Sequence, residues 1–264
     1  MNQVFNIKRF LRYANYNIRI SQKMLLLVFG GFTAALFLVE LLIFKNNLSW
    51  TENNWASLFF VSYAIAGLLI IGNSFPFLRK RDKTLVNFVL PVSTTEKYLY
   101  ELVFKVGIFT LLFLLAFSII SDIAMEFAKF LNRDRLARFA DSGNPINILP
   151  FKFEYLLLKG EEYLFEFLLW AFGLGFSLAF AGSVAFRKFP LIKTIILLGI
   201  IVLLIIGYFY LSFEKMDLKY GVQYVTKAII PDYESAIKWG FSLIGVSIVT
   251  ALTYSFFKLK EREV

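Results

Sequence analysis

A cluster of charged residues near position 80 is the first feature of the sequence that could do chemistry. Five consecutive positions carry four positive charges and one negative charge: Arg79, Lys80, Arg81, Asp82 and Lys83. Apolar stretches lie on both sides of the cluster. Lysine and arginine at this density are typical of loops on the cytoplasmic face of a membrane protein. The chemistry predicted for this cluster is electrostatic contact and not covalent catalysis.

A short apolar segment follows the cluster. Thr84 to Leu90 is long enough for two helical turns, and Pro91 ends it because the residue before a proline is pushed out of the helical region. Apolar side chains outside the bilayer core need a covering surface, which is either the bilayer or a partner protein. The alternative is an ordinary positively charged loop with an apolar centre. The candidate partner-binding residues of this segment are Thr84, Leu85, Val86, Asn87, Phe88 and Pro91.

Several classes of catalytic chemistry are excluded by composition. The chain has no His and no Cys, so it lacks the commonest general base, the commonest metal ligand and any thiolate. No G-x-x-x-x-G-K-[ST] phosphate loop occurs. We therefore predict no catalytic residues, no metal site and no cofactor bound by this chain itself.

The composition places the chain in a membrane. It has 264 residues, is 58% hydrophobic and contains 32 Phe. That exceeds what one soluble core could bury, because a soluble domain still needs a polar exterior. The formal charge of +9 then reflects basic residues that face anionic lipid and not nucleic acid.

Six windows are long and apolar enough to cross a bilayer core of ~30 Å. We predict an all-α, six-span membrane domain over residues 1–264, with spans at Met24–Phe44, about Ala56–Phe77, Tyr98–Ile120, Tyr163–Phe186, Phe189–Phe213 and Ile237–Phe257. Only Arg187 and Lys188 separate the fourth and fifth spans, so these two form a tight hairpin, with Pro190 in the first turn of the second helix.

The distribution of basic residues orients these spans. With the N-terminus inside, the inner segments 1–23, 78–97, 187–188 and 258–264 hold 15 Lys and Arg in 52 positions. The outer segments 45–55, 121–162 and 214–236 hold ten in 76. Because cytoplasmic loops carry the excess of positive charge, we expect both termini in the cytoplasm.

Further helices are expected outside the bilayer. Val4–Ile20 has its apolar residues within about 120° of arc and basic residues on the neighbouring flank, which predicts an interfacial helix with its basic side toward lipid phosphates. The alternative is a basic flank that only sets topology. Ser93-Thr94-Thr95-Glu96 fits a capping box that starts the third span. The outer loop 121–162 has a helical stretch near Ile123–Phe139, and aromatic residues over 211–236 indicate short helices in the outer leaflet.

Inside the spans, a stripe of small residues stands out. Such residues let helix backbones approach closely, either within one bundle or between subunits. In the fourth span they recur every four residues: Ala171, Gly175, Ala179 and Ser183. The charged residues Glu40, Glu101, Lys105, Glu166, Lys193 and Lys238 lie within about two turns of span ends, where we expect them to reach the interface. This pattern does not favour an ion-coupled transporter.

Together these features resemble the permease subunit of type-2 ABC exporters. The resemblance rests on the N-terminal amphipathic helix, the six spans, the loop RKRDKTLVNFVLPVSTTEKYL and the segment 211–236; LPVSTTEKYL is similar to permeases of Bacteroidota. It implies a bacterial inner-membrane protein that exports a lipid, glycolipid, peptide or drug. ATP would be hydrolysed by a separate ATPase subunit, on which the helix Thr84–Leu90 docks with Arg79–Lys83 facing acidic residues or lipid phosphate.

The resemblance also implies a second permease copy, identical or similar, with the substrate path at the shared interface. The outer loop 121–162 is longer than a minimal member needs, so the substrate class stays open. Two other classes of function are alternatives to the exporter. An integral-membrane enzyme would need an Asp/Glu or Ser/Lys constellation, which the sequence does not offer. A non-transporting six-span scaffold or sensor remains the alternative, and a neighbouring Walker-type ATPase gene would favour the exporter.

Overall fold

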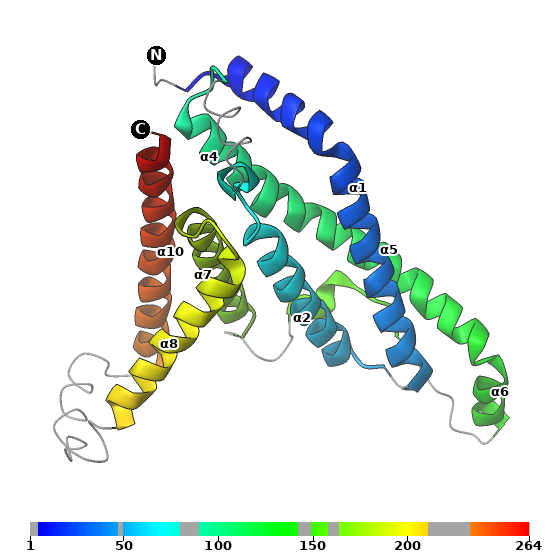
Figure 1. Cartoon of the computed structure of the whole chain (residues 1–264). Coiled ribbons are helices and arrows are strands. Elements are labelled where there is room, and N and C mark those ends of the chain that lie inside the picture. The colour runs from blue at the N-terminus through cyan, green and yellow to red at the C-terminus, as the bar shows by residue number, and fades with distance from the viewer. Residues whose placement is uncertain are drawn as a thin grey trace. The chain divides into compact units, whose positions relative to one another are not determined.

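The structure is a computed structural model that describes residues 5–46, 50–79, 90–141, 149–157, 164–210 and 233–263. Within these residues the chain is helical, without a β-strand (Figure 1). Five helices are long and apolar enough to cross a membrane: Leu25–Lys45, Glu52–Ile71, Thr94–Leu131, Leu164–Ala185 and Ile237–Arg262. A shorter apolar stretch covers Pro190–Leu204. The prediction of a helical, multi-pass membrane protein is confirmed.

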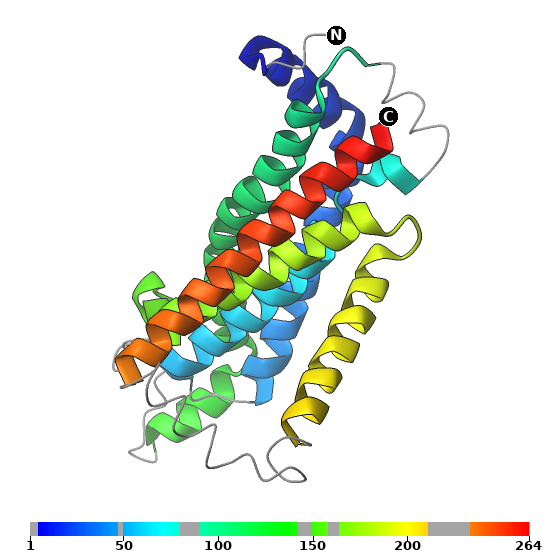
Figure 2. The same cartoon turned by 90° about the vertical axis from the view of Figure 1, so that its left-hand side faces the viewer.

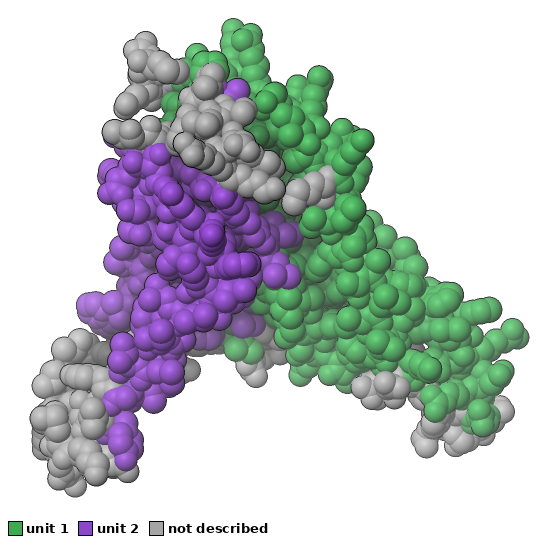
Figure 3. Space-filling view, in the orientation of Figure 1, with its two compact units in different colours: residues 1–67, 91–166 green, residues 68–90, 167–264 purple. Residues whose placement is uncertain are grey.

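The described chain forms two compact units, which Figure 3 colours separately. Unit 1 comprises residues 1–67 and 91–166, and unit 2 comprises residues 68–90 and 167–264. The chain therefore passes from one unit to the other within the second helix, between residues 90 and 91, and between residues 166 and 167.

Unit 1 is built around α1 (Ile7–Asn46) and α5 (Phe109–Leu131), which pack side by side. Phe32 contacts Phe113 with ring centroids 5.5 Å apart, and Phe37 contacts Phe127 at 6.1 Å. The remaining helical elements of this unit are most of α2 (Glu52–Ile71), α4 (Thr94–Leu102), the π-helical stretch η2 (Val103–Ile108), α6 (Arg133–Asp141) and the 3-10 turn η3 (Phe153–Leu157).

An aromatic core centred on Trp55 holds unit 1 together. Trp55 is fully buried and donates its indole N–H to the carbonyl of Leu149 at 2.9 Å. Edge-on ring contacts link it to Phe44 at 5.4 Å and to Phe151 at 5.6 Å. Edge-on pairs stabilise beyond the burial of their area, so these rings fix the start of α2 against α1 and α5.

The first helix differs from the prediction. From Ile7 onward, the expected interfacial helix Val4–Ile20 and the first span are parts of one continuous helix, α1 (Ile7–Asn46), of 40 residues. Figures 1 and 2 show that α1 bends in its N-terminal half. Asn17 Nδ2 donates to the Tyr13 carbonyl at 3.0 Å, and Ser21 Oγ donates to the Asn17 carbonyl at 2.5 Å. Side chains that bond the carbonyl four residues earlier bend helices, so these two bonds give a local cause for a bend.

The second predicted span is displaced along the sequence. We expected it near Ala56–Phe77, but α2 covers Glu52–Ile71, and Pro76 begins the separate 3-10 turn η1 (Pro76–Arg79). A turn at Gly72 and Asn73 ends the helix instead. The Asn73 side chain donates to the Leu69 carbonyl at 2.7 Å, so it satisfies a carbonyl that the last helical turn leaves free.

The third span belongs to a longer helical run. α4, η2 and α5 continue without a break from Thr94 to Leu131, beyond the predicted Tyr98–Ile120. Asn132 interrupts the run before α6, so the predicted outer stretch near Ile123–Phe139 consists of the end of α5 and most of α6. The sequence did not indicate the π-helical stretch Val103–Ile108.

Unit 2 contains η1, α7 (Leu164–Ala185), α8 (Pro190–Tyr210) and α10 (Tyr233–Glu263), apart from the first residues of α7. The predicted tight turn before Pro190 is confirmed, with α7 ending at Ala185 and Pro190 starting α8. Arg262 Nη2 donates to the Ala185 carbonyl at 2.7 Å. This cation stabilises the C-terminal end of α7. The predicted outer-leaflet segment 211–236 lies almost entirely outside the described residues.

Candidate functional site

The basic loop, residues 78–97, is the candidate site, and the structure describes both of its ends. Its middle is outside the described residues. That middle holds most of the predicted partner-binding residues: Lys80, Arg81, Asp82, Lys83, Thr84, Leu85, Val86, Asn87 and Phe88. Of the remaining two, Arg79 is half-buried and Pro91 is exposed. The described geometry therefore shows how the two ends of the basic loop are anchored.

The entry anchor of the basic loop lies in unit 2, at Phe75. This residue has φ 53°, in the left-handed region that non-glycine residues rarely adopt. Its ring is fully buried and contacts Phe180 of α7 at 5.1 Å and Phe77 at 5.9 Å. A conformation of this kind costs of order 1–3 kcal/mol and persists only where surrounding contacts hold it. Phe75 thus ties the start of the basic loop to α7.

Two further contacts stiffen the entry anchor. Arg79 Nη1 donates to Asn73 Oδ1 at 2.8 Å, which fastens the last described residue before the loop to the turn after α2. Gly72 packs so closely on Leu191 of α8 that a Cβ atom at this position would overlap the leucine side chain. The predicted binding residue Arg79 is therefore partly engaged within the chain, and the entry anchor contacts both α7 and α8.

The exit anchor lies in unit 1, at Glu96. The predicted capping box is confirmed: the Glu96 N–H donates to Ser93 Oγ at 3.3 Å, and the Ser93 N–H donates to Glu96 Oε2 at 3.0 Å. These reciprocal bonds satisfy two N–H groups at the start of α4. They fix the direction in which the chain leaves the basic loop.

Glu96 also binds the start of α1, which sequence reasoning missed. Its carboxylate accepts the Asn6 N–H at 2.8 Å, Arg9 Nε at 2.7 Å and Arg9 Nη2 at 2.7 Å. The Glu96 side chain is fully buried, while Arg9 is partly exposed. The hydrogen bonds from Arg9 to Glu96 raise the pKa of the Arg9 guanidinium above its ordinary value, so the guanidinium stays charged.

An aromatic contact continues the exit anchor along both helices. The rings of Tyr13 on α1 and Tyr100 on α4 meet edge-on at 5.4 Å. Both are buried, as are Lys97 and Glu101 on α4. The amphipathic N-terminal helix and the exit from the basic loop therefore form one packed structure.

Two charged residues of the predicted spans do not reach the interface as predicted. We expected Glu40 to reach the interface, but it is fully buried on α1 and its Oε1 accepts the Ser121 hydroxyl of α5 at 2.9 Å. Glu101 is also buried, whereas Glu166, Lys193 and Lys238 are exposed and Lys105 is half-buried. Glu40 is a single hydrogen-bonded carboxyl between two helices, which serves packing. Within the described residues, no group of three Asp or Glu could hold a metal ion.

The predicted packing stripe of α7 has a gradient of burial. Ala171 and Gly175 are half-buried, and Ala179 and Ser183 are buried. A Cβ atom added at Gly175 would meet no atom within 4 Å. The close approach occurs instead at Gly182, where a Cβ atom would overlap Thr194 of α8. The face at Gly175 is thus open in the single chain, and its packing role stays a prediction.

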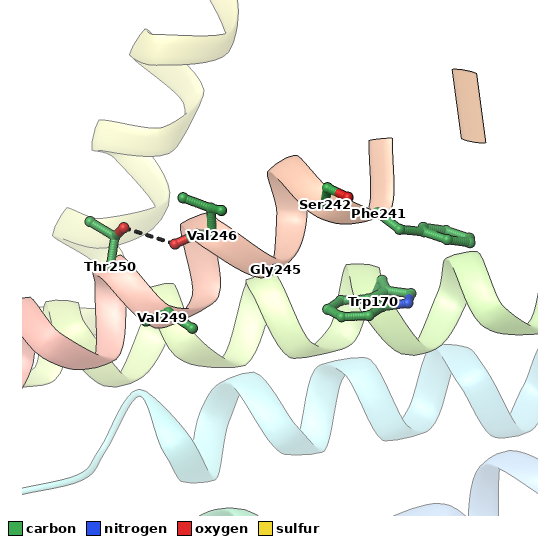
Figure 4. A pocket seen from close by; sticks show the side chains of 7 residues that line it. All are labelled: Trp170, Phe241, Ser242, Gly245, Val246, Val249 and Thr250. Atoms are coloured by element: carbon green, nitrogen blue, oxygen red, sulfur yellow. Dashed lines mark hydrogen bonds between the residues drawn. The ribbon is translucent and has the colours of Figure 1, made fainter. Parts of the chain in front are cut away.

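A groove lies between α7 and α10 in unit 2 (Figure 4). Its volume is about 440 Å³, and its walls include Trp170, which stacks on Phe241 at 6.0 Å. Ser242 and Thr250 also line it, but each hydroxyl donates to a backbone carbonyl of α10. The groove offers an apolar packing surface and not a site for chemistry.

Comparisons of this chain with protein-family models, with curated proteins and with solved structures find no match.

Proposed function

We propose that this chain is the membrane-spanning permease subunit of an ABC exporter of type 2. It has six spans, with α8 as the fifth, lies in the bacterial inner membrane and has both termini in the cytoplasm. It moves an amphipathic substrate, with ATP hydrolysed by a separate ATPase subunit and a second permease copy completing the path.

The observation that carries this proposal is the anchoring of the basic loop. Its entry end is packed on α7 and α8 of unit 2 through Phe75 and Gly72. Its exit end is bound to α1 of unit 1 through Glu96. Force applied to the loop would therefore act on both compact units. A loop that receives mechanical work from a partner needs this arrangement, whereas a passive connection does not.

The charge of the loop supplies the docking chemistry. Lys80, Arg81 and Lys83 can bind acidic residues of the partner, and Leu85 and Phe88 can enter an apolar groove on it. Arg79 contributes less to docking because its guanidinium is bonded to Asn73. The small-residue face at Gly175, which is open in the single chain, is available for the second permease copy.

The proposal is tested by purifying the tagged chain from its native membrane and identifying the proteins that accompany it. We expect a Walker-type ATPase to co-purify. The triple variant Lys80→Glu, Arg81→Glu and Lys83→Glu should reduce its yield at least about tenfold, because three docking charges are reversed. Arg79 is left intact so that the entry anchor is preserved.

The matched control reverses three exposed cations of unit 1 outside the basic loop: Arg133→Glu, Arg138→Glu and Lys152→Glu. This variant should retain the ATPase. If no ATPase accompanies the wild-type chain, the exporter is rejected and the non-transporting scaffold or sensor is favoured. If the ATPase is retained equally by both variants, the basic loop is not its docking site.

A further inference from the structure

The first turns of α1 carry two different exposed surfaces beside the face that packs on the protein. The packed face consists of buried or half-buried side chains: Phe10, Tyr13, Ala14, Asn17 and Ser21. Ile7, Leu11 and Ile18 recur at helical spacing and form an exposed apolar stripe. Each of these three residues is followed directly in the sequence by a basic residue. This produces an adjacent exposed stripe, named here the basic stripe: Lys8, Arg12, Arg19 and Lys23.

The basic stripe has no counter-charge of its own. None of its four residues makes an ion pair with any part of the chain that the structure describes. Between Phe5 and Val39 the sequence contains no Asp or Glu. Arg9 belongs to the same sequence cluster but turns away, to Glu96. Arg9 thereby differs from the four residues of the basic stripe, which form no ion pair within the described residues.

The position of the basic stripe along α1 matches the headgroup layer of a bilayer. The candidate span starts at Leu25, two positions after Lys23, and the side chains from Leu25 to Phe29 are exposed. The helix continues without a break, and it bends in its N-terminal half. A helix that leaves the hydrocarbon at Lys23 and then bends can lie in the interface, with apolar side chains in the acyl layer and cations at the phosphates.

We propose that the basic stripe of α1 is a binding surface for the phosphate groups of anionic phospholipids in the bilayer. An acidic surface of a protein partner is the competing occupant. The bilayer is favoured because the neighbouring stripe of Ile7, Leu11 and Ile18 requires hydrocarbon, and because the basic stripe ends directly at a membrane span. This inference does not rest on the proposed exporter function.

The test uses the full chain in detergent micelles that contain either phosphatidylglycerol or phosphatidylcholine, with bound lipid counted by native mass spectrometry. Wild type should retain phosphatidylglycerol in preference to phosphatidylcholine. The variant Lys8→Gln, Arg12→Gln, Arg19→Gln and Lys23→Gln should lose about tenfold or more of its apparent affinity for phosphatidylglycerol. Phosphatidylcholine retention should not change.

Two controls make the result specific. Neutralising four exposed cations elsewhere, Arg133, Arg138, Lys152 and Lys188, should leave the preference intact. Exchanging Lys and Arg within the basic stripe should also preserve it, because the charge is kept. Equal phosphatidylglycerol retention by the wild type and the neutralised stripe overturns the proposal. If that variant instead loses a co-purifying protein while keeping the lipid, the occupant is an acidic partner.

Discussion

At the scale of single residues, two phenylalanines share a rare backbone conformation in opposite surroundings. Phe75 has φ 53° and is fully buried, whereas Phe189 has φ 51° and is 70% exposed. Both pay the steric cost of a left-handed conformation. Only Phe75 offsets this steric cost through ring contacts. The Phe75 side chain, and not the backbone turn itself, therefore holds the entry anchor of the basic loop in place.

Glycine substitution should separate the two effects. Phe189→Gly removes strain and little packing, so we expect a thermal midpoint in detergent no lower than that of wild type. Phe75→Gly removes the same strain but also a buried ring, and we expect a loss of about 2–4 kcal/mol from cavity formation less the relieved strain. Tryptophan fluorescence during heating measures both. Equal midpoints for the two variants would show that the Phe75 ring is not an anchor.

Glu96 shows how one residue can have a local and a distant role. Its capping of α4 depends on Ser93, three positions earlier, whereas its bonds to Arg9 join residues 87 positions apart. Glu40 is also fully buried near a helix end, where its carboxyl accepts a hydrogen bond from Ser121, whereas Glu166 near the start of α7 is exposed. A charged residue near a span end can therefore be interfacial or buried, depending on which helix faces it.

At the scale of helices, the hairpin of α7 and α8 contains a close approach at one glycine. Gly182 lies against Thr194, whose hydroxyl donates to the Pro190 carbonyl at 2.8 Å. The turn contains Arg187 and Lys188, which are exposed. The hairpin thus behaves as one element, and the entry anchor contacts it through Phe180 and Leu191.

Two glycines of α7 should respond differently to the same change. Gly182→Ala forces a methyl group into Thr194, and we expect it to destabilise the chain by about 1–3 kcal/mol through overpacking. Gly175→Ala meets open space and improves helix propensity, so stability should stay equal or rise by up to about 1 kcal/mol. The measurement is thermal unfolding in detergent. A larger loss for Gly175→Ala would reverse the assignment of the close contact.

The bulkier variant Gly175→Leu addresses assembly and not the stability of one chain. If the open face of α7 meets a second permease copy, this substitution should lower the yield of dimer in size-exclusion chromatography while the thermal midpoint of the monomer is kept. A normal dimer would place the half-buried part of the stripe, Ala171 and Gly175, against lipid.

At the scale of the whole molecule, the number of spans decides where the C-terminus lies. Five helices satisfy the length and composition needed to cross a membrane, and the apolar stretch of α8 is shorter. With six spans both termini share one side, whereas five spans put them on opposite sides. The count therefore bears directly on whether the basic loop and both termini can lie together in the cytoplasm.

Because the chain has no cysteine, single cysteines can report this topology. In intact cells we expect a membrane-impermeant maleimide to label Arg138→Cys and Lys152→Cys but not Lys8→Cys, Arg187→Cys or Lys260→Cys. Permeabilised cells should label all five, which controls for accessibility. Labelling of Lys260→Cys without that of Lys8→Cys would give an odd number of spans. The reverse pattern at every position would place the basic loop outside and remove the proposed function.

The sequence by itself determined the membrane class, the approximate helices, the tight turn before Pro190 and the capping box at Ser93. Each of these depends on a run of neighbouring residues: about 20 apolar positions for a span, or four residues for a cap. The end of α2 was misplaced because apolar residues continue through Phe77, and only the backbone turn at Gly72 separates them from the helix.

Only the tertiary structure decided which charges and small residues meet. The pairing of Arg9 with Glu96, the burial of Glu40 and the contact of Gly182 rather than Gly175 all depend on how each helix is rotated toward its neighbours. In a chain this rich in apolar residues, nearly every face of a helix is hydrophobic enough to be buried or to face lipid. Periodicity then cannot select the contact face, and the fit of side chains between helices makes that choice.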